Sequence, residues 1–257
     1  MYYLKLKYFE LISPFPIKTN IGNIQSPTLK KIWDLGYQTY QSYLNFLLIS
    51  PEMYCNVINP SLKQWYETRL HLNNNITLFD ICQVDNNLIK TLEEIFNFYF
   101  VEDVSWNEDK KMFFISVTKD DEISLIGAIN QTTWSDVIDI ILQLSNIHIE
   151  EDTDNIKSNK AKAIMEKIKA GRKKMAEKDK SRKDFELDNL VSVVANRHSN
   201  LNILNIWGLT VNQLWDTFTR LMNDNIYGMT SRSVSVWGDE QKQFNANDWI
   251  KRIDSEN

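Results

Sequence analysis

Histidine is the side chain best suited to acid–base or metal chemistry near neutral pH, and this chain has three. They are His71, His148 and His198, and no two of them lie within four residues of each other. A helical zinc site needs two histidines about one turn apart on the same face, so this spacing excludes such a pair. We interpret each histidine as a surface or core-edge residue and predict no metal site.

The seven glycines are too scattered to form a phosphate-binding loop. Such a loop needs clustered glycines so that backbone N–H groups can approach the anion, and the two closest here, Gly228 and Gly238, are ten residues apart. No serine lies in a GxSxG nucleophile elbow. The sequence therefore predicts no catalytic residues and no cofactor, and we expect a protein that is not an enzyme.

Carboxylates and cysteines do not form a recognisable site either. A calcium loop needs a turn glycine and a distal glutamate, and the acidic stretch that begins at residue 150 lacks both. We interpret that stretch as a solvated hinge. Cys55 and Cys82 cannot build a disulfide framework and have no CxxC neighbour, so we expect two reduced, half-buried thiols.

Residues 157–183 concentrate positive charge in an otherwise acidic chain. The segment holds twelve Lys or Arg against three Asp or Glu, a net charge of +9, whereas the whole chain carries -5. Its apolar residues recur at helical spacing, which favours a solvated amphipathic linker helix. A nucleic-acid arm is disfavoured because the segment has no aromatic residue to stack on bases.

A partner-binding helix is the remaining interpretation of this basic segment, because a methionine-containing stripe with cationic flanks suits adaptable helix–helix contacts. Two tryptophans near the end of the chain could serve as exposed anchors for a partner. The candidate partner-binding residues are Ile164, Met165, Ile168, Arg172, Lys173, Lys174, Met175, Trp237 and Trp249. We expect the other tryptophans to belong mostly to the core.

Few glycines, and five prolines confined to the first sixty residues, indicate a mainly helical fold. A period-2 pattern predicts a half-exposed strand over 3–11, and short β-prone runs at 101–106, 111–118 and 122–129 predict a small antiparallel meander that this strand could join. Helical spacing of apolar residues predicts helices over 26–48, 77–83, 85–100, from 133, at 190–195 and from 210.

Three capping patterns support these helices. Ser26 precedes Pro27 in a predicted first turn, Asp85 can cap the helix over 85–100, and Asp136 is placed for a capping box. The helix from Thr210 should bury one stripe of residues, and a final turn near the end should dock Trp249 and Ile253. That stripe comprises Val211, Leu214, Trp215, Phe218, Leu221 and Met222.

We therefore predict a mainly α fold with a small antiparallel β meander, in three parts: an α+β domain over 1–148, a basic helical linker over 149–186 and a helical C-terminal domain over 187–257. The sequence has neither a secretory signal nor an apolar run long enough to span a membrane. We expect a cytoplasmic protein with no membrane partner.

The order of these parts, and above all the stretch "SNLNILNIWGLTVNQLWDTF" at 199–218, resembles proteins encoded among the tail genes of phages and prophages of Gram-positive bacteria. "VSVWGDE" followed by "NDW" gives a weaker likeness. The resemblance is to tail assembly chaperones. It implies a non-enzymatic helical protein in the host cytoplasm that keeps the tape-measure protein, or another tail protein, soluble during assembly.

Three further possibilities remain open at this stage. The charge split is compatible with a homo-oligomer. A structural tail or adaptor protein of the virion would fit the same resemblance, and a nucleic-acid-binding protein would act through residues 157–183.

Overall fold

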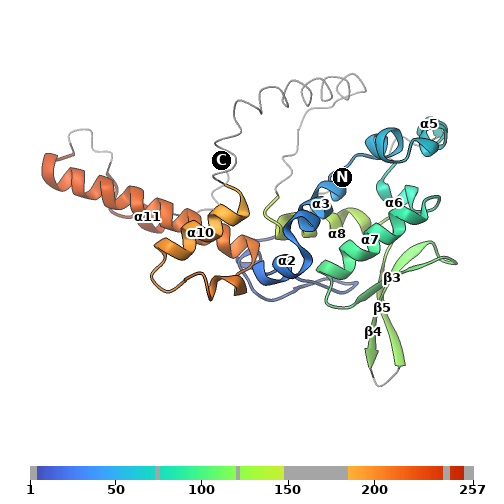
Figure 1. The fold of residues 1–257 in the computed structure, drawn as a ribbon, viewed down its shortest axis with the longest axis horizontal. Coiled ribbons are helices and arrows are strands. Elements are labelled where there is room, and N and C mark those ends of the chain that lie inside the picture. The colour runs from blue at the N-terminus through green and yellow to red at the C-terminus, as the bar shows by residue number, and fades with distance from the viewer. Residues whose placement is uncertain (1–4, 73–75, 120–121, 148–184, 240–243, 252–257) are drawn as a thin grey trace. The chain divides into compact units, whose positions relative to one another are not determined.

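The computed structural model describes residues 5–72, 76–119, 122–147, 185–239 and 244–251 (Figure 1). The fold is mainly α with a small antiparallel meander, as predicted, and it has a second small antiparallel sheet that was not predicted. Contacts divide the chain into two compact units. Unit 1 comprises residues 1–147 together with Thr210–Asn212, and unit 2 comprises the remaining residues. The basic linker predicted over 149–186 lies almost wholly outside the described residues. Each unit is considered by itself.

Unit 1 begins with a short helix, α1 (Tyr8–Leu11), so the strand predicted over 3–11 is wrong. The backbone N–H of Lys7 donates to the Glu10 carboxylate at 2.7 Å, a local contact that closes a helical turn and outweighs the alternating pattern. The strands β1 (Ile17–Lys18) and β2 (Asn23–Ile24) then form a separate two-stranded sheet. The predicted meander consequently has no strand from the start of the chain.

The helix predicted over 26–48 is interrupted at Gly36 and consists of α2 (Leu29–Leu35) and α3 (Tyr37–Leu47). Gly36 has φ +94°, which residues with a Cβ rarely adopt. The predicted cap is also wrong, because Thr28 caps α2 by accepting the N–H of Lys31 at 3.2 Å. The hydroxyl of Ser26 is instead buried and donates to the carbonyl of Leu144.

The segment after Pro51 forms short helical pieces that the sequence did not predict. Proline is compatible with the first turn of a helix because its missing N–H would be unpaired there anyway. The pieces are α4 (Pro51–Met53), a π-helical turn (Tyr54–Ile58), a 3-10 turn (Pro60–Leu62) and α5 (Lys63–Leu72).

The centre of unit 1 agrees with the prediction. It contains α6 (Leu78–Ile81), α7 (Asn86–Tyr99), the meander β3 (Asp103–Asn107), β4 (Met112–Lys119) and β5 (Glu122–Ile129) in the order β3-β4-β5, and then α8 (Trp134–Leu144). The Asp85 side chain caps α7 as predicted. The capping box predicted with Asp136 is wrong, because Thr133 at the start of α8 makes no side-chain cap.

An aromatic cluster joins these helices to the meander. The ring of Phe96 lies 5.1 Å from that of Phe113 and 5.8 Å from that of Trp134, between ring centroids. Trp134 is buried, but Trp33, Trp237 and Trp249 are 73%, 80% and 57% exposed. Trp33 is not one of the two proposed anchors, so the expectation that the other tryptophans lie mostly in the core is too broad.

Unit 2 contains α10 (Leu187–Arg197), a 3-10 turn (Ile206–Gly208), most of α11 (Val211–Trp237) and a last 3-10 turn (Asp248–Ile250). The stripe predicted to be buried on α11 is buried only in part. Leu214 is fully buried, Trp215 and Phe218 are half-buried, and Met222 is exposed. The final turn does not bury Trp249.

Candidate protein-binding face on α11

Seven of the nine predicted partner-binding residues, those between 164 and 175, lie outside the described residues. Trp237 and Trp249 are described, and both are exposed, as expected of partner anchors; for Trp249 this contradicts the alternative expectation that it docks in a final turn. Trp237 ends α11, while Trp249 belongs to the C-terminal segment that contacts α11 from another side. Whether either tryptophan binds a partner stays a prediction.

Trp237 lies at the end of an apolar stripe that runs along the exposed half of α11. At about 100° per residue, Met222, Ile226, Met229 and Val236 fall within an arc of roughly 80°. Their exposed fractions are 43%, 51%, 58% and 69%. Their spacing of three, four and seven residues is that of a helix seam which normally packs against another helix. We call these four residues and Trp237 the α11 stripe.

The opposite side of α11 is covered by the chain's own C-terminal segment. The hydroxyl of Tyr227 donates to the carbonyl of Ala246 at 3.3 Å, and the ring of Tyr227 lies 5.6 Å from that of Phe244. The guanidinium of Arg220 donates to the carbonyl of Lys251 at 2.9 Å. Arg220 and Tyr227 lie about 140–180° around the helix from Met222 and Met229, and the stripe residues remain exposed, so this segment does not cover the stripe.

At its N-terminal end, the side of α11 that bears the stripe is covered from within unit 2. Trp215 and Phe218 lie on that side, and the ring of Phe185 stacks on Trp215 and meets Phe218 edge to face, at 6.4 and 6.0 Å. One side of the same helix is thus packed as far as Phe218 and exposed from Met222 onward.

The exposed half of α11 is poorly suited to standing alone in water. Residues 221–237 contain only two charged side chains, Asp224 and Arg232, and the rest of the polar side is Asn, Ser and Thr with one glycine. These residues have low helix propensity and provide no pattern of stabilising ion pairs. Helices of this kind gain their stability from packing of an apolar face, so the composition favours a partner on the stripe.

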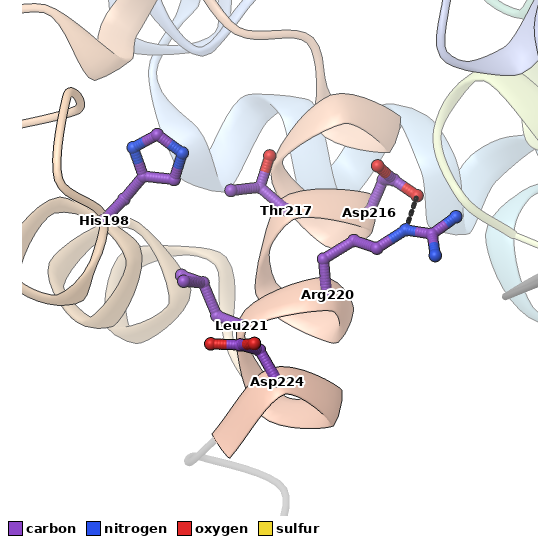
Figure 2. A pocket seen from close by; sticks show the side chains of 6 residues that line it. All are labelled: His198, Asp216, Thr217, Arg220, Leu221 and Asp224. Atoms are coloured by element: carbon purple, nitrogen blue, oxygen red, sulfur yellow. Dashed lines mark ion pairs between the residues drawn. The ribbon is translucent and has the colours of Figure 1, made fainter. Parts of the chain in front are cut away.

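A pocket of about 290 Å³ lies beside α11 and is the second candidate site (Figure 2). Figure 2 shows the His198 ring on one side, facing Thr217 and Leu221 across the pocket, with the side chain of Arg220 directed the other way. Six residues line it: His198, Asp216, Thr217, Arg220, Leu221 and Asp224.

The polar groups of this pocket are engaged in local structure. Nδ1 of His198 accepts the backbone N–H groups of Asn200 and Leu201 at 3.1 and 3.0 Å, which shapes the turn after α10. The hydroxyl of Thr217 donates to a carbonyl of its own helix at 2.7 Å. Arg220 pairs with Asp216 at 4.0 Å. These six residues include no hydroxyl or thiol activated by a base, so the pocket supports no nucleophilic chemistry.

A buried polar cluster in unit 1 surrounds Asp85. Its carboxylate accepts the hydroxyl of Tyr54 and the side-chain amide of Asn59, each at 2.7 Å, and it also accepts two N–H groups at the start of α7. Burial alone would raise the pKa of Asp85, but these hydrogen bonds outweigh it and leave the pKa lowered. The cluster is a saturated helix cap.

Both thiols border this cluster, and burial raises the pKa of Cys55 and of Cys82. A raised pKa leaves the thiols protonated and poor as nucleophiles or metal ligands at neutral pH. Both cysteines are free and fully buried, so they lie deeper in the core than predicted. Within the described ranges, His, Cys, Asp and Glu side chains form no group of three or more that could hold a metal ion.

Comparison with known proteins links unit 2 to phages. Residues 177–254 match the family described as YomV second domain, which derives from a phage protein. This range contains the stretch at 199–218 on which the resemblance to phage proteins rests, and it contains the α11 stripe. No curated protein and no solved structure matches the chain. Among the helices of the described residues, none is long and apolar enough to cross a membrane.

Proposed function

We propose that this protein is a non-enzymatic phage tail assembly chaperone, which binds a helix of a long client such as the tape-measure protein and keeps that client soluble in the host cytoplasm. The α11 stripe is the observation that carries the proposal. The match of residues 177–254 to a phage-derived family supports a role in a phage and leaves the client unspecified.

The stripe has the properties of a helix-binding surface. A partner helix laid along it would meet side chains at positions 222, 226, 229 and 236, the spacing that anchors amphipathic helices in apolar grooves. Two of the four are methionines, whose flexible side chains adapt to different partner sequences. Holding a client needs no turnover, because binding the unassembled form protects it by mass action.

Replacing two central stripe residues with glutamine tests this surface. In the variant Ile226→Gln/Met229→Gln, each lost side chain removes about 1 kcal/mol of binding energy, since full burial of such a residue yields about 1.5–3 kcal/mol and each is already half-covered. The affinity for the client should then fall roughly 30-fold. Far-ultraviolet circular dichroism should be unchanged, because both positions are exposed.

Ser235→Gln is the matched control, since it introduces the same side chain at an exposed position of α11 outside the stripe. The assay is affinity capture with the tagged full chain from phage-producing cells, followed by mass spectrometry and titration of the captured client. Equal binding by the stripe variant and the control would remove the stripe from the mechanism.

The same capture separates the two alternative functions. A structural tail or adaptor protein would be found inside purified virions, whereas a chaperone would be absent from them. A nucleic-acid-binding protein acting through residues 157–183 would carry nucleic acid that is released at high salt. Neutralising Arg172, Lys173 and Lys174 would abolish that signal and leave the effect of the stripe variant intact.

A further inference from the structure

The strand β5 places apolar side chains at an open edge of the meander in unit 1. Ile123, Leu125 and Ile126 are 76%, 59% and 46% exposed. In the order β3-β4-β5, β5 pairs with β4 on one side, and no other described strand pairs with its second side. Soluble proteins usually protect such an edge with charges, proline or a covering segment, because its free N–H and C=O groups attract another strand.

The β4–β5 hairpin also extends beyond the rest of the sheet (Figure 1). Pairing of β3 with β4 ends at Asp103 and Ser116, whereas pairing of β4 with β5 continues to Lys119 and Glu122. The end of the hairpin is therefore a two-stranded ribbon, which has little stability of its own in water. A further strand on β5 would support this ribbon.

The exposed apolar side chains of Ile123 and Leu125 lie on one face of β5. Ile123 and Leu125 pair with Thr118 and Ser116 of β4, on the face opposite the buried Ile115. A bulge between Ile115 and Ser116 leaves Ile126 as the extra residue of β5. The apolar pair on this face is placed symmetrically about Ser124.

We propose that β5 pairs antiparallel with β5 of a second copy of this chain, with Ser124 opposite Ser124 of the second copy. This register places Ile123 opposite Leu125 of the second copy, and the reverse, so four aliphatic side chains meet on one face. It places Glu122 opposite Ile126, so no like charges face each other. Aliphatic pairs and a serine pair across strands are favourable, and two three-stranded sheets become one sheet of six strands.

The charge pattern favours a second copy of this chain as the occupant. Residues 122–126 carry a single charge, so an ordinary charged partner strand finds no complement there, whereas the segment complements itself about Ser124. The three exposed side chains offer roughly 300 Å² per copy, which places the pair below the roughly 1,200 Å² of a stable interface. The dimer is therefore weak and forms with rising concentration.

Sedimentation equilibrium of the full chain between roughly 1 and roughly 300 µM measures this association. The intact protein should shift from monomer to dimer, and Leu125→Lys should weaken the dimer at least tenfold, because it places a charge at the edge. Ser105→Lys is the matched control, since Ser105 is exposed on the same face of β3, at the other edge of the sheet. A monomer at every concentration, or a dimer insensitive to Leu125→Lys, overturns the proposal.

A disulfide trap tests the register independently. Directly opposed cross-strand residues have Cβ atoms about 5 Å apart, close enough for a disulfide after a small adjustment. Ser124→Cys should therefore give a covalent dimer on mild oxidation, while Ser105→Cys should not. The native Cys55 and Cys82 are buried and do not compete. Failure of Ser124→Cys to cross-link while Leu125→Lys still disrupts the dimer would overturn the proposed register.

Discussion

Removing the carboxylate of Asp85 should destabilise unit 1 by an amount that its four hydrogen bonds allow us to work out. Asp85→Ala deletes the cap of α7, which costs about 1 kcal/mol. It also leaves the buried hydroxyl of Tyr54 without its acceptor, and an unsatisfied buried donor costs about 1–3 kcal/mol. Asn59 is partly exposed and can bond to water instead. The expected total is about 3 kcal/mol.

The pH dependence of this loss has a definite sign. The pKa of Asp85 is lowered below its reference value of 3.8 in the folded protein. A lowered pKa means that the carboxylate stabilises the fold above the reference pKa, and that this contribution is lost as the pH falls through the folded-state pKa. The difference between the intact protein and Asp85→Asn should therefore be larger at about pH 7 than at about pH 3.

Urea unfolding followed by circular dichroism measures both effects. Asp80→Ala is the matched control, because Asp80 accepts the N–H and hydroxyl of Thr77 at the start of α6 without a fully buried partner. This control should cost only about 1 kcal/mol. In a Tyr54→Phe background, Asp85→Ala should cost about 2 kcal/mol less, since no hydroxyl is then left without its acceptor. A loss below about 1 kcal/mol, or one independent of pH, would refute this reasoning.

Two further predictions concern close packing in unit 1. Gly127→Ala should lower the free energy of unfolding by about 3 kcal/mol or more in urea unfolding, because its Cβ would meet backbone atoms of Ile21 that cannot move aside. Gly228→Ala is the control, since Gly228 has open space around it. Equal stability of the two variants would contradict the close contact between Gly127 and Ile21. Cys55 and Cys82 should not react with a thiol reagent at about pH 8 in the native protein, because burial raises the pKa of each thiol. Both should react in denaturant. Reaction of either thiol in the native protein would show that unit 1 opens.

Where local chemistry and periodicity agreed, the sequence predicted the structure correctly. Asp85 before a strong apolar stripe identified the start of α7, and short β-prone runs between charged turns identified the meander. Where a single contact or backbone angle determined the local structure, the hydrophobic pattern gave a wrong prediction. Glu10 bonds to the backbone of Lys7 and forms a helix where alternation indicated a strand. Gly36 breaks a helix whose apolar spacing continues across the break.

The proposed binding surface on α11 shows a different limit of sequence reasoning. Three-and-four spacing identified the side of α11 that carries Trp215, Phe218 and Met222, yet periodicity indicates a shared side of a helix and does not say what covers it. Phe185 covers the first two and leaves Met222 exposed. The scarcity of charge over 221–237 was the available signal, because a stripe meant for solvent would normally be flanked by ion pairs.

The two proposed surfaces belong to different units and have complementary consequences. The α11 stripe spans only a few helical turns, so under the proposed function one copy would bind a single short segment of a client. A long helical client offers many such segments. Pairing through β5 would couple two stripes, and the second contact would then form at a high effective concentration set by the linkage. A weak stripe and a weak dimer can in this way hold a long client firmly, and both release readily when the client is taken up by assembly.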